Sequence, residues 1–181
     1  MVVVTDGDEI ARQAVETAAR KLRLRTISQS HGNPTPLTAA EIVSLLRQAP
    51  YDPVVVMVDD RGRAGKGKGE RVLEGLARSG EVEILGIVAV ASNCHRVSGT
   101  VVDLSVTQDG QLVSEAVDKK GHPTGSWRLL GDTVDVVEKL EIPVVIGLGD
   151  IGKMQGHDQS QAGAPITEQA IREILKRSGS L

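Results

Sequence analysis

Acidic residues follow three separate apolar runs of the sequence, at the places where predicted strands end. Carboxylates that come from different strands and lie within several ångström of one another form an oxygen site suited to Mg²⁺ or Ca²⁺. Two such ions would support phosphoryl chemistry. We predict the following residues at this site: Asp6, Asp59 and Asp60 as metal ligands, and Asn93, Gly149 and Lys153 as ligand-binding residues.

Each of these aspartates, taken singly, has a simpler interpretation. Asp and Gly are common after strands, where Asp caps the next helix and Gly permits a tight turn. The prediction of a bound cation or anion therefore depends on the groups lying together. Asp6 and Asp59 are more than 50 residues apart in the sequence, so only the fold can bring them together.

The elements that would position these residues alternate along the first half of the chain. Short apolar runs predict strands, and segments with helical spacing lie between them. We predict strands over 2–5, 24–27, 54–58 and 84–91, and helices over 8–22, from Thr38 to about Pro50, and over 70–79. This β-α-β-α-β-α-β order indicates a parallel sheet, which collects ligands at the carboxyl ends of its strands.

The second half of the chain has a different pattern. Residues 100–107 and 112–117 alternate apolar and polar side chains around Asp109-Gly110, which predicts an antiparallel β-ribbon over about 100–118. A helix over 132–140, a strand over 143–147, a polar and mobile segment over 154–163 and a helix over 165–177 follow. We therefore predict a single α/β domain over residues 1–181. Its mainly parallel sheet would have about four to five strands with helices on both faces, and the ribbon would be an insertion.

Composition excludes several classes of protein. The chain has 181 residues, 40% of them hydrophobic, and a net charge of -3, which is typical of a globular domain and not of a disordered chain. The near-balanced charge and the scarcity of aromatic residues argue against a nucleic-acid partner. The apolar runs are shorter than the roughly 18 residues that span a bilayer, and no export signal is present, so we expect cytoplasmic synthesis. The single cysteine, Cys94, excludes an intrachain disulfide.

Two glycine-rich segments resemble phosphate-binding motifs only superficially. Residues 147–152 match GxGxxG, but the segment that follows is not convincingly helical and no ribose-binding acid follows, so we reject a dinucleotide site. Residues 61–69 carry four basic residues and four glycines without the Walker A spacing. We favour a solvated loop there, and an anion-wrapping loop is the alternative.

Several blocks together resemble a known family. These are VVTDGDE (3–9), GNP (32–34), PYDPV (50–54), VDD (58–60), AVASN (89–93), GDT (131–133) and GLGDIGKM (147–154), with PIT at 165–167. They resemble the soluble stage V sporulation protein AE family of spore-forming Firmicutes. The resemblance implies a non-enzymatic role in sporulation and germination, accessory to the system that moves calcium dipicolinate across the inner spore membrane. It also implies other stage V sporulation membrane proteins as partners and a location peripheral to that membrane.

A weaker resemblance is to the Toprim fold of topoisomerases and primases. Asp6-Gly7 corresponds to the acid and glycine after the first Toprim strand, with Asp in place of Glu. Asp59 corresponds to the first acid of the Asp-x-Asp pair, but Arg61 occupies the second position and Asp60 comes one residue early. This resemblance implies the alternative of a metal-dependent phosphotransferase or nuclease with a degenerate acidic site. A third hypothesis is an oligomeric scaffold with an apolar patch on the ribbon.

Overall fold

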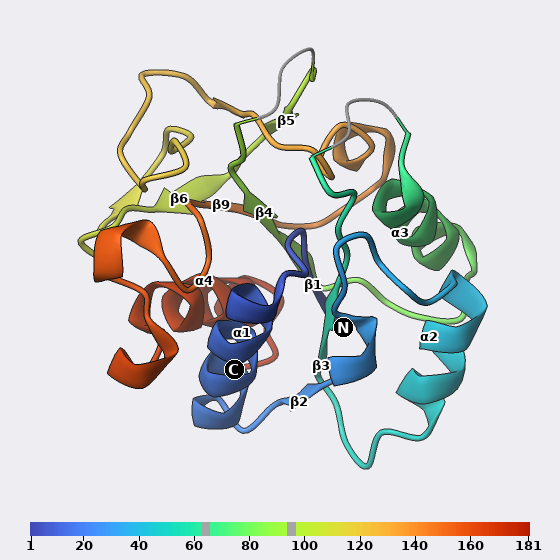
Figure 1. Cartoon of the computed structure of the whole chain (residues 1–181). Helices are drawn as coiled ribbons and strands as arrows, with labels where there is room; N and C mark the ends of the chain where they lie inside the picture. Colours follow the sequence, from blue (N-terminus) through green and yellow to red (C-terminus); the bar gives the residue numbers. More distant parts are fainter. Residues whose placement is uncertain (63–65, 94–96) are drawn as a thin grey trace.

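The computed structural model describes residues 1–62, 66–93 and 97–181, and a mostly parallel sheet lies at its centre (Figure 1). Among these residues the sheet has seven strands in the order β2-β3-β1-β4-β9-β6-β7, and only β7 is antiparallel to its neighbour. Its strands are β1 (Val2–Val4), β2 (Arg25–Thr26), β3 (Val54–Met57), β4 (Gly86–Val90), β6 (Leu104–Val106), β7 (Leu112–Val113) and β9 (Val145–Leu148). The predicted α/β class is confirmed, with a larger sheet than the predicted four to five strands.

Helices cover both faces of this sheet. They are α1 (Glu9–Lys21), α2 (Ala39–Arg47), α3 (Lys68–Arg78) and α4 (Pro165–Arg177). Figure 1 shows α1 and α4 on one side of the sheet and α2 and α3 on the other. Side chains alternate accordingly, because Val2 and Val4 pack in the core beneath α1 and α4, whereas Val3 packs in the core beneath α2 and α3. Burial on both faces explains why the strands are continuous apolar runs in the sequence.

Side chains cap the starts of two helices, α1 and α2. The Asp8 carboxylate accepts a hydrogen bond from the Ala11 amide at 2.8 Å, so Asp8 is the N-cap of α1. Thr38 and Glu41 form a reciprocal capping box at the start of α2, in which the Thr38 amide donates to the Glu41 carboxylate at 2.7 Å. Both arrangements satisfy amides that would otherwise have no partner in the first helical turn.

The predicted ribbon over 100–118 is divided between two sheets. Strands β6 and β7 form the expected hairpin around Asp109-Gly110, but β6 also extends the main sheet by pairing parallel with β9. Strand β5 (Thr100–Val101) instead pairs with β8 (Arg128–Leu129) in a separate two-stranded sheet. Alternation in the sequence indicated strands correctly, but it carries no information about which distant strand is the partner.

The predicted helix over 132–140 is wrong. The structure has only a short 3-10 turn there, η2 (Val137–Lys139). Val134, Val136 and Val137 are all buried, which does not match the one-sided spacing of a surface helix. The Asp135 carboxylate accepts from the Gly99 amide at 2.7 Å, so it fixes the neighbouring chain instead of capping a helix.

The segment after β9 contains short 3-10 turns, as does the loop after β2. The turns are η1 (Ser28–Ser30), η3 (Met154–Gly156) and η4 (Ser160–Ala162). In the segment over 154–163, which was predicted to be polar and mobile, Met154 and Asp158 are buried and the other residues are exposed or half-buried. None of the described helices is both long and apolar enough to cross a membrane.

Cys94 and residues 63–65 of the basic loop lie outside the described residues.

Candidate functional site

The connections of the sheet create a crevice at the carboxyl ends of its central strands. The chain leaves β1 toward β2 on one side and leaves β4 toward β6 on the other side, so these neighbours form a topological switch point. A cleft of about 250 Å³ opens there. Its lining includes, in chain order, Asp6, Asp8, Asp59, Asn93, Lys119, Asp132, Asp150 and Lys153.

The structure places four of the six predicted site residues at this cleft: Asp6, Asp59, Asn93 and Lys153. Asp60 lies elsewhere. Its carboxylate accepts from the amides of Gly69 at 2.6 Å and Glu70 at 3.0 Å, so it satisfies the first turn of α3. Neighbouring residues at the end of a strand point to opposite sides, so Asp59 and Asp60 face different surroundings.

Gly149 serves the cleft through the backbone. A Cβ at this position would lie 2.8 Å from the Gly121 amide nitrogen and 2.9 Å from the Lys119 carbonyl oxygen. A glycine therefore lets the loop around Lys119 pass close to the end of β9, where the Asp150 amide donates to the Lys119 carbonyl at 2.9 Å. This close approach brings the Lys119 side chain to the cleft.

Asp59 connects the loops that follow β1 and β3. Its side chain accepts from the Gly7 amide at 3.0 Å and from the Arg61 amide at 2.7 Å, and the residue is only 5% exposed. Burial raises the pKa of Asp59, the hydrogen bonds from the Arg61 and Gly7 amides oppose it, and with the negative charge of Asp132 the net result is a pKa of about 6. Asp59 is therefore mostly ionised at neutral pH and is held rigidly.

Asp6 lies beside Asp59 and has the more strongly shifted carboxyl group. Burial, which is the largest effect, and the charges of Asp8 and Asp59 together raise the pKa of Asp6 to about 8. At neutral pH Asp6 consequently keeps its proton. A bound cation would favour the ionised form of Asp6, because it would offset the charges that now oppose ionisation.

Lys153 supplies a fixed positive charge. Its ammonium group donates to Asp8 at 2.7 Å and to Asp150 at 3.1 Å, across the cleft. Burial opposes the charged form, but the two carboxylates outweigh it and raise the pKa of Lys153 to about 12. Burial also acts to raise the pKa of Asp8, whereas its bonds to Lys153 and to the Ala11 amide lower it overall.

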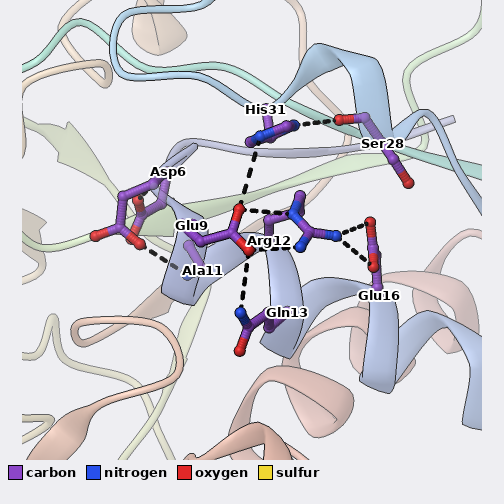
Figure 2. Close-up of polar contacts among 9 residues, drawn as sticks. Asp6, Glu9, Ala11, Arg12, Gln13, Glu16, Ser28 and His31 are labelled. Carbon is purple, nitrogen blue, oxygen red and sulfur yellow. Dashed lines mark hydrogen bonds and ion pairs between the residues drawn. The ribbon is translucent and has the colours of Figure 1, made fainter.

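Glu9, the acidic residue in the first turn of α1, does not line the cleft. Figure 2 shows Glu9 paired with Arg12, which also binds Glu16, while Gln13 and His31 contact Glu9 from either side. The Arg12 guanidinium and the Gln13 amide hold the pKa of Glu9 well below its usual range, at about 2. These charges compensate one another at the surface.

Sequence reasoning missed several lining residues. Asp8 and Asp150 lie within two residues of the predicted Asp6 and Gly149, so their position after strands was a usable signal. Asp132 stands at the start of the predicted helix over 132–140, but its carboxylate accepts from the Gly62 amide and lines the cleft. Lys119 pairs with Asp150 at 3.5 Å, and no local pattern in the sequence indicates this long-range contact.

The cleft offers a divalent cation only part of a coordination shell. In the part of the chain that the structure describes, no group of three or more His, Cys, Asp or Glu side chains is arranged to hold a metal ion. Asp6 and Asp59 could supply carboxylate oxygens, whereas Ca²⁺ takes six to eight oxygen ligands. The remaining positions would have to be filled by water or by oxygens of a second ligand.

Asp6→Asn is expected to stabilise the protein at neutral pH. The pKa of Asp6 is raised from 3.8 to about 8, so the unfolded chain loses a proton that the folded chain keeps, and stability falls as pH rises across this window. Asn imitates the protonated side chain. In urea unfolding at pH 7, the free energy of unfolding of Asp6→Asn should be about 2 kcal/mol higher than that of the wild type, allowing for partial exposure. Near pH 4 the variant and the wild type should have similar free energies of unfolding.

The exposed Asp109→Asn is the matched control, because its side chain is 64% exposed. Its unfolding free energy should differ little from wild type at either pH. An Asp6→Asn variant that is less stable than wild type at pH 7 would show that Asp6 is ionised in the folded protein.

Comparison with known proteins agrees with the resemblance seen in the motifs. The sequence profile of the family described as Stage V sporulation protein AE1 matches residues 1–178. Neither a curated protein nor a solved structure gives a significant match. Because the profile covers nearly the whole chain, including every segment that lines the cleft, the chain belongs to the stage V sporulation protein AE1 family.

Proposed function

We propose that this sporulation protein is a non-enzymatic binding protein that also acts in germination. It would be accessory to the system that moves calcium dipicolinate across the inner spore membrane. The observation that carries the proposal is the cleft at the switch point, where Asp6 and Asp59 lie together with Lys153. Carboxylates suit a divalent cation such as Ca²⁺ or Mg²⁺, and the lysines suit a small anion.

The chemistry of the cleft favours binding over proton transfer by Lys153. A general base must lose and regain a proton near the operating pH. Lys153 bridges two carboxylates, which raise its pKa to about 12, so it stays charged. A fixed charge of this kind orients a ligand and balances the surrounding acids.

Partners in this proposal are other stage V sporulation membrane proteins, at the surface of the inner spore membrane. Support comes from apolar side chains exposed on and next to the small sheet of β5 and β8: Val101, Trp127 and Leu130. Trp127 is 69% exposed, and exposed Trp is enriched at interfaces between proteins. Association of two copies through the same surface is the homo-oligomer alternative.

Asp59→Asn is expected to weaken cation binding at least about tenfold, since it removes one of the two carboxylates proposed to bind the cation. Calorimetric titration of the full chain with CaCl₂ and MgCl₂, with and without dipicolinate, measures this effect. The Gly7 and Arg61 amides bind different oxygens of Asp59, so Asn keeps an acceptor for only one of them, and we expect the fold to persist with lower stability. Circular dichroism checks that it does.

Asp60→Asn is the matched control for Asp59→Asn. It changes the adjacent carboxyl group, which satisfies α3 amides and lies outside the cleft lining. Cation affinity should stay within about twofold of wild type in this variant. Equal weakening by both substitutions, or no cation binding by the wild-type chain, would contradict the proposed site.

A metal-dependent phosphotransferase or nuclease is the second candidate. The observation that favours it is Asp6, which is protonated at neutral pH beside the ionised Asp59 and could act as a general acid. Incubation of the chain with labelled DNA, RNA and nucleotides in Mg²⁺ or Mn²⁺ tests this candidate. Turnover that disappears in Asp6→Asn would favour it over the binding protein.

A further inference from the structure

A separate hollow lined by three arginines lies at the end of α1 that is remote from the cleft. It has a volume of about 300 Å³, and Arg20, Arg23, Arg25 and Tyr51 belong to its lining, so we call it the arginine hollow. Arg25 begins β2 and pairs with the first residue of β3, which places the hollow toward the amino ends of these strands. Figure 1 shows the end of α1 and β2 in the lower part of the view. Among the described residues, the linings of the cleft and of the arginine hollow have no member in common.

The turn after α1 brings the arginines to this hollow. The Arg23 amide donates to the Arg20 carbonyl at 3.1 Å, and the Leu24 amide donates to the Ala19 carbonyl at 2.8 Å, which is the Schellman pattern of a helix end. Arg23 occupies the left-handed position of this motif, with a φ of 58°. Glycine is usual there, because a side chain is strained in this conformation. Arg23 therefore costs stability through its backbone, and a binding role of its side chain would explain the residue.

The positive charge of the arginine hollow is not balanced by acidic side chains. None of its three arginines forms an ion pair within residues 1–62, 66–93 and 97–181. Glu16 also lines the hollow, but each of its carboxylate oxygens accepts from Arg12 at 2.8 Å, as Figure 2 shows. The carboxyl end of α1 adds roughly half a negative charge, which three guanidinium groups outweigh. The hollow therefore favours an anion.

The chemistry of the lining favours phosphate over other anions. A guanidinium group is planar and presents paired N–H donors that match two oxygens of one phosphate. A phosphate monoester has a second pKa of about 6, so above that pH it carries close to two negative charges for the three arginines to balance. Tyr51 is 49% exposed at the hollow and adds a neutral hydroxyl group. The volume is at the lower end of the range of small-molecule sites, about 300–1,000 Å³, which suits a small ester.

We propose that the arginine hollow binds a phosphate monoester, whose source is either a small soluble molecule or the headgroup of a lipid. Arg20, Arg23 and Arg25 bind the phosphate oxygens, and the rest of the ester extends past Tyr51 toward solvent. The proposal does not depend on the cation site, because the two sites lie at opposite ends of α1 and share no side chain among the described residues.

The first test is a titration of the ¹⁵N-labelled full chain with glycerol 1-phosphate at pH 8 and low ionic strength, followed by amide and arginine side-chain signals. The largest shifts should fall at residues 20–26 and at Tyr51. Glycerol 1-phosphate should bind at least about tenfold more tightly than glycerate, which is similar in size but carries a single negative charge. Equal binding of the two compounds, or shifts located elsewhere, would overturn the proposal.

Arg23→Gly is expected to weaken the binding of glycerol 1-phosphate about tenfold, because it removes one charged donor. Glycine suits the left-handed backbone at this position, so the variant should fold. Arg61→Gly is the matched control, since Arg61 is also exposed, has a φ of 59° and loses the same charge, but does not line the arginine hollow. Its affinity should stay within about twofold of wild type. Equal weakening in both variants would mean attraction by net charge alone and would overturn the site.

The second test identifies the source of the phosphate. Vesicles of phosphatidylcholine with and without phosphatidic acid are sedimented with the wild type and with Arg23→Gly, because phosphatidic acid carries the same glycerol phosphate group as the soluble probe. Sedimentation that requires phosphatidic acid and falls in Arg23→Gly supports the site with a lipid as its ligand. Binding of the soluble probe without sedimentation supports the site with a free ester. Absence of both overturns the arginine hollow as a site, and leaves the outcome of the calcium titrations at the cleft unaffected.

Discussion

Asp158→Ala is expected to lower the free energy of unfolding by about 4 kcal/mol, which is a large fraction of the stability of a typical domain. Asp158 is fully buried between the segment after β9 and the start of α4. Its carboxyl group accepts from the amides of Gly152, Ile166 and Thr167 at 2.9–3.0 Å, and from the Thr167 hydroxyl at 2.6 Å. Alanine would leave all four donors without this partner.

Asp158→Asn gives an intermediate case that tests the cause. Asn retains the oxygen that accepts from the Ile166 and Thr167 amides but replaces the one that serves Gly152, so about half of the loss is expected. Urea unfolding of both variants and of the exposed Asp109→Ala measures the differences. A loss below about 1 kcal/mol in Asp158→Ala would show that water replaces these bonds.

The same hydrogen bonds position part of the cleft. Asp158 fixes Gly152, the residue before Lys153, relative to α4. The sequence reads as polar and mobile here, because the partners of a buried Asp cannot be recognised from composition. Asp158 does not line the cleft, and we expect it to act on the proposed site through the position of Lys153.

The central sheet and the core of the site were predictable for a physical reason. Strands β1, β3 and β4 are buried on both faces, so each is a continuous run of apolar residues with acidic or polar residues at its carboxyl end. Parallel strands bring those ends to one edge. The Gly7 amide donates to the Asp59 carboxylate, so the loops after β1 and β3 meet. The prediction that Asp6 and Asp59 lie close together required these two loops to meet.

Long-range pairing limits the rest of the prediction. Thr100 pairs with Leu129, and the Lys119 loop packs against Gly149, but neither contact leaves a periodic signal in the sequence. The distinction between Asp59 and Asp60 was accessible in principle, since successive residues of an extended chain point in opposite directions. Only the packing of α3 decides which of the two carboxylates caps the helix.

Cation affinity at the cleft is expected to rise about a hundredfold between pH 6 and pH 8. Asp6 has its pKa raised to about 8 by burial and by the charges of Asp8 and Asp59, and a cation binds its ionised form. Below about pH 8, binding must therefore expel the Asp6 proton, which costs about a factor of ten in affinity per pH unit. Asp59 has a pKa of about 6, so cation binding expels a second proton, from Asp59, mainly below about pH 6.

Calorimetric titrations with CaCl₂ in buffers of different ionisation enthalpy count the expelled protons. Wild type should release about 0.9 proton per cation at pH 7, since Asp6 is then about nine-tenths protonated. Asp6→Asn should release almost none and show a nearly flat affinity from pH 6 to pH 8, whereas Asp60→Asn should keep the wild-type slope. A pH-independent affinity in the wild type would mean that the cation binds without engaging Asp6, and the coordination would then have to depend on Asp59 and other side chains that line the cleft, such as Asp8 and Asp132.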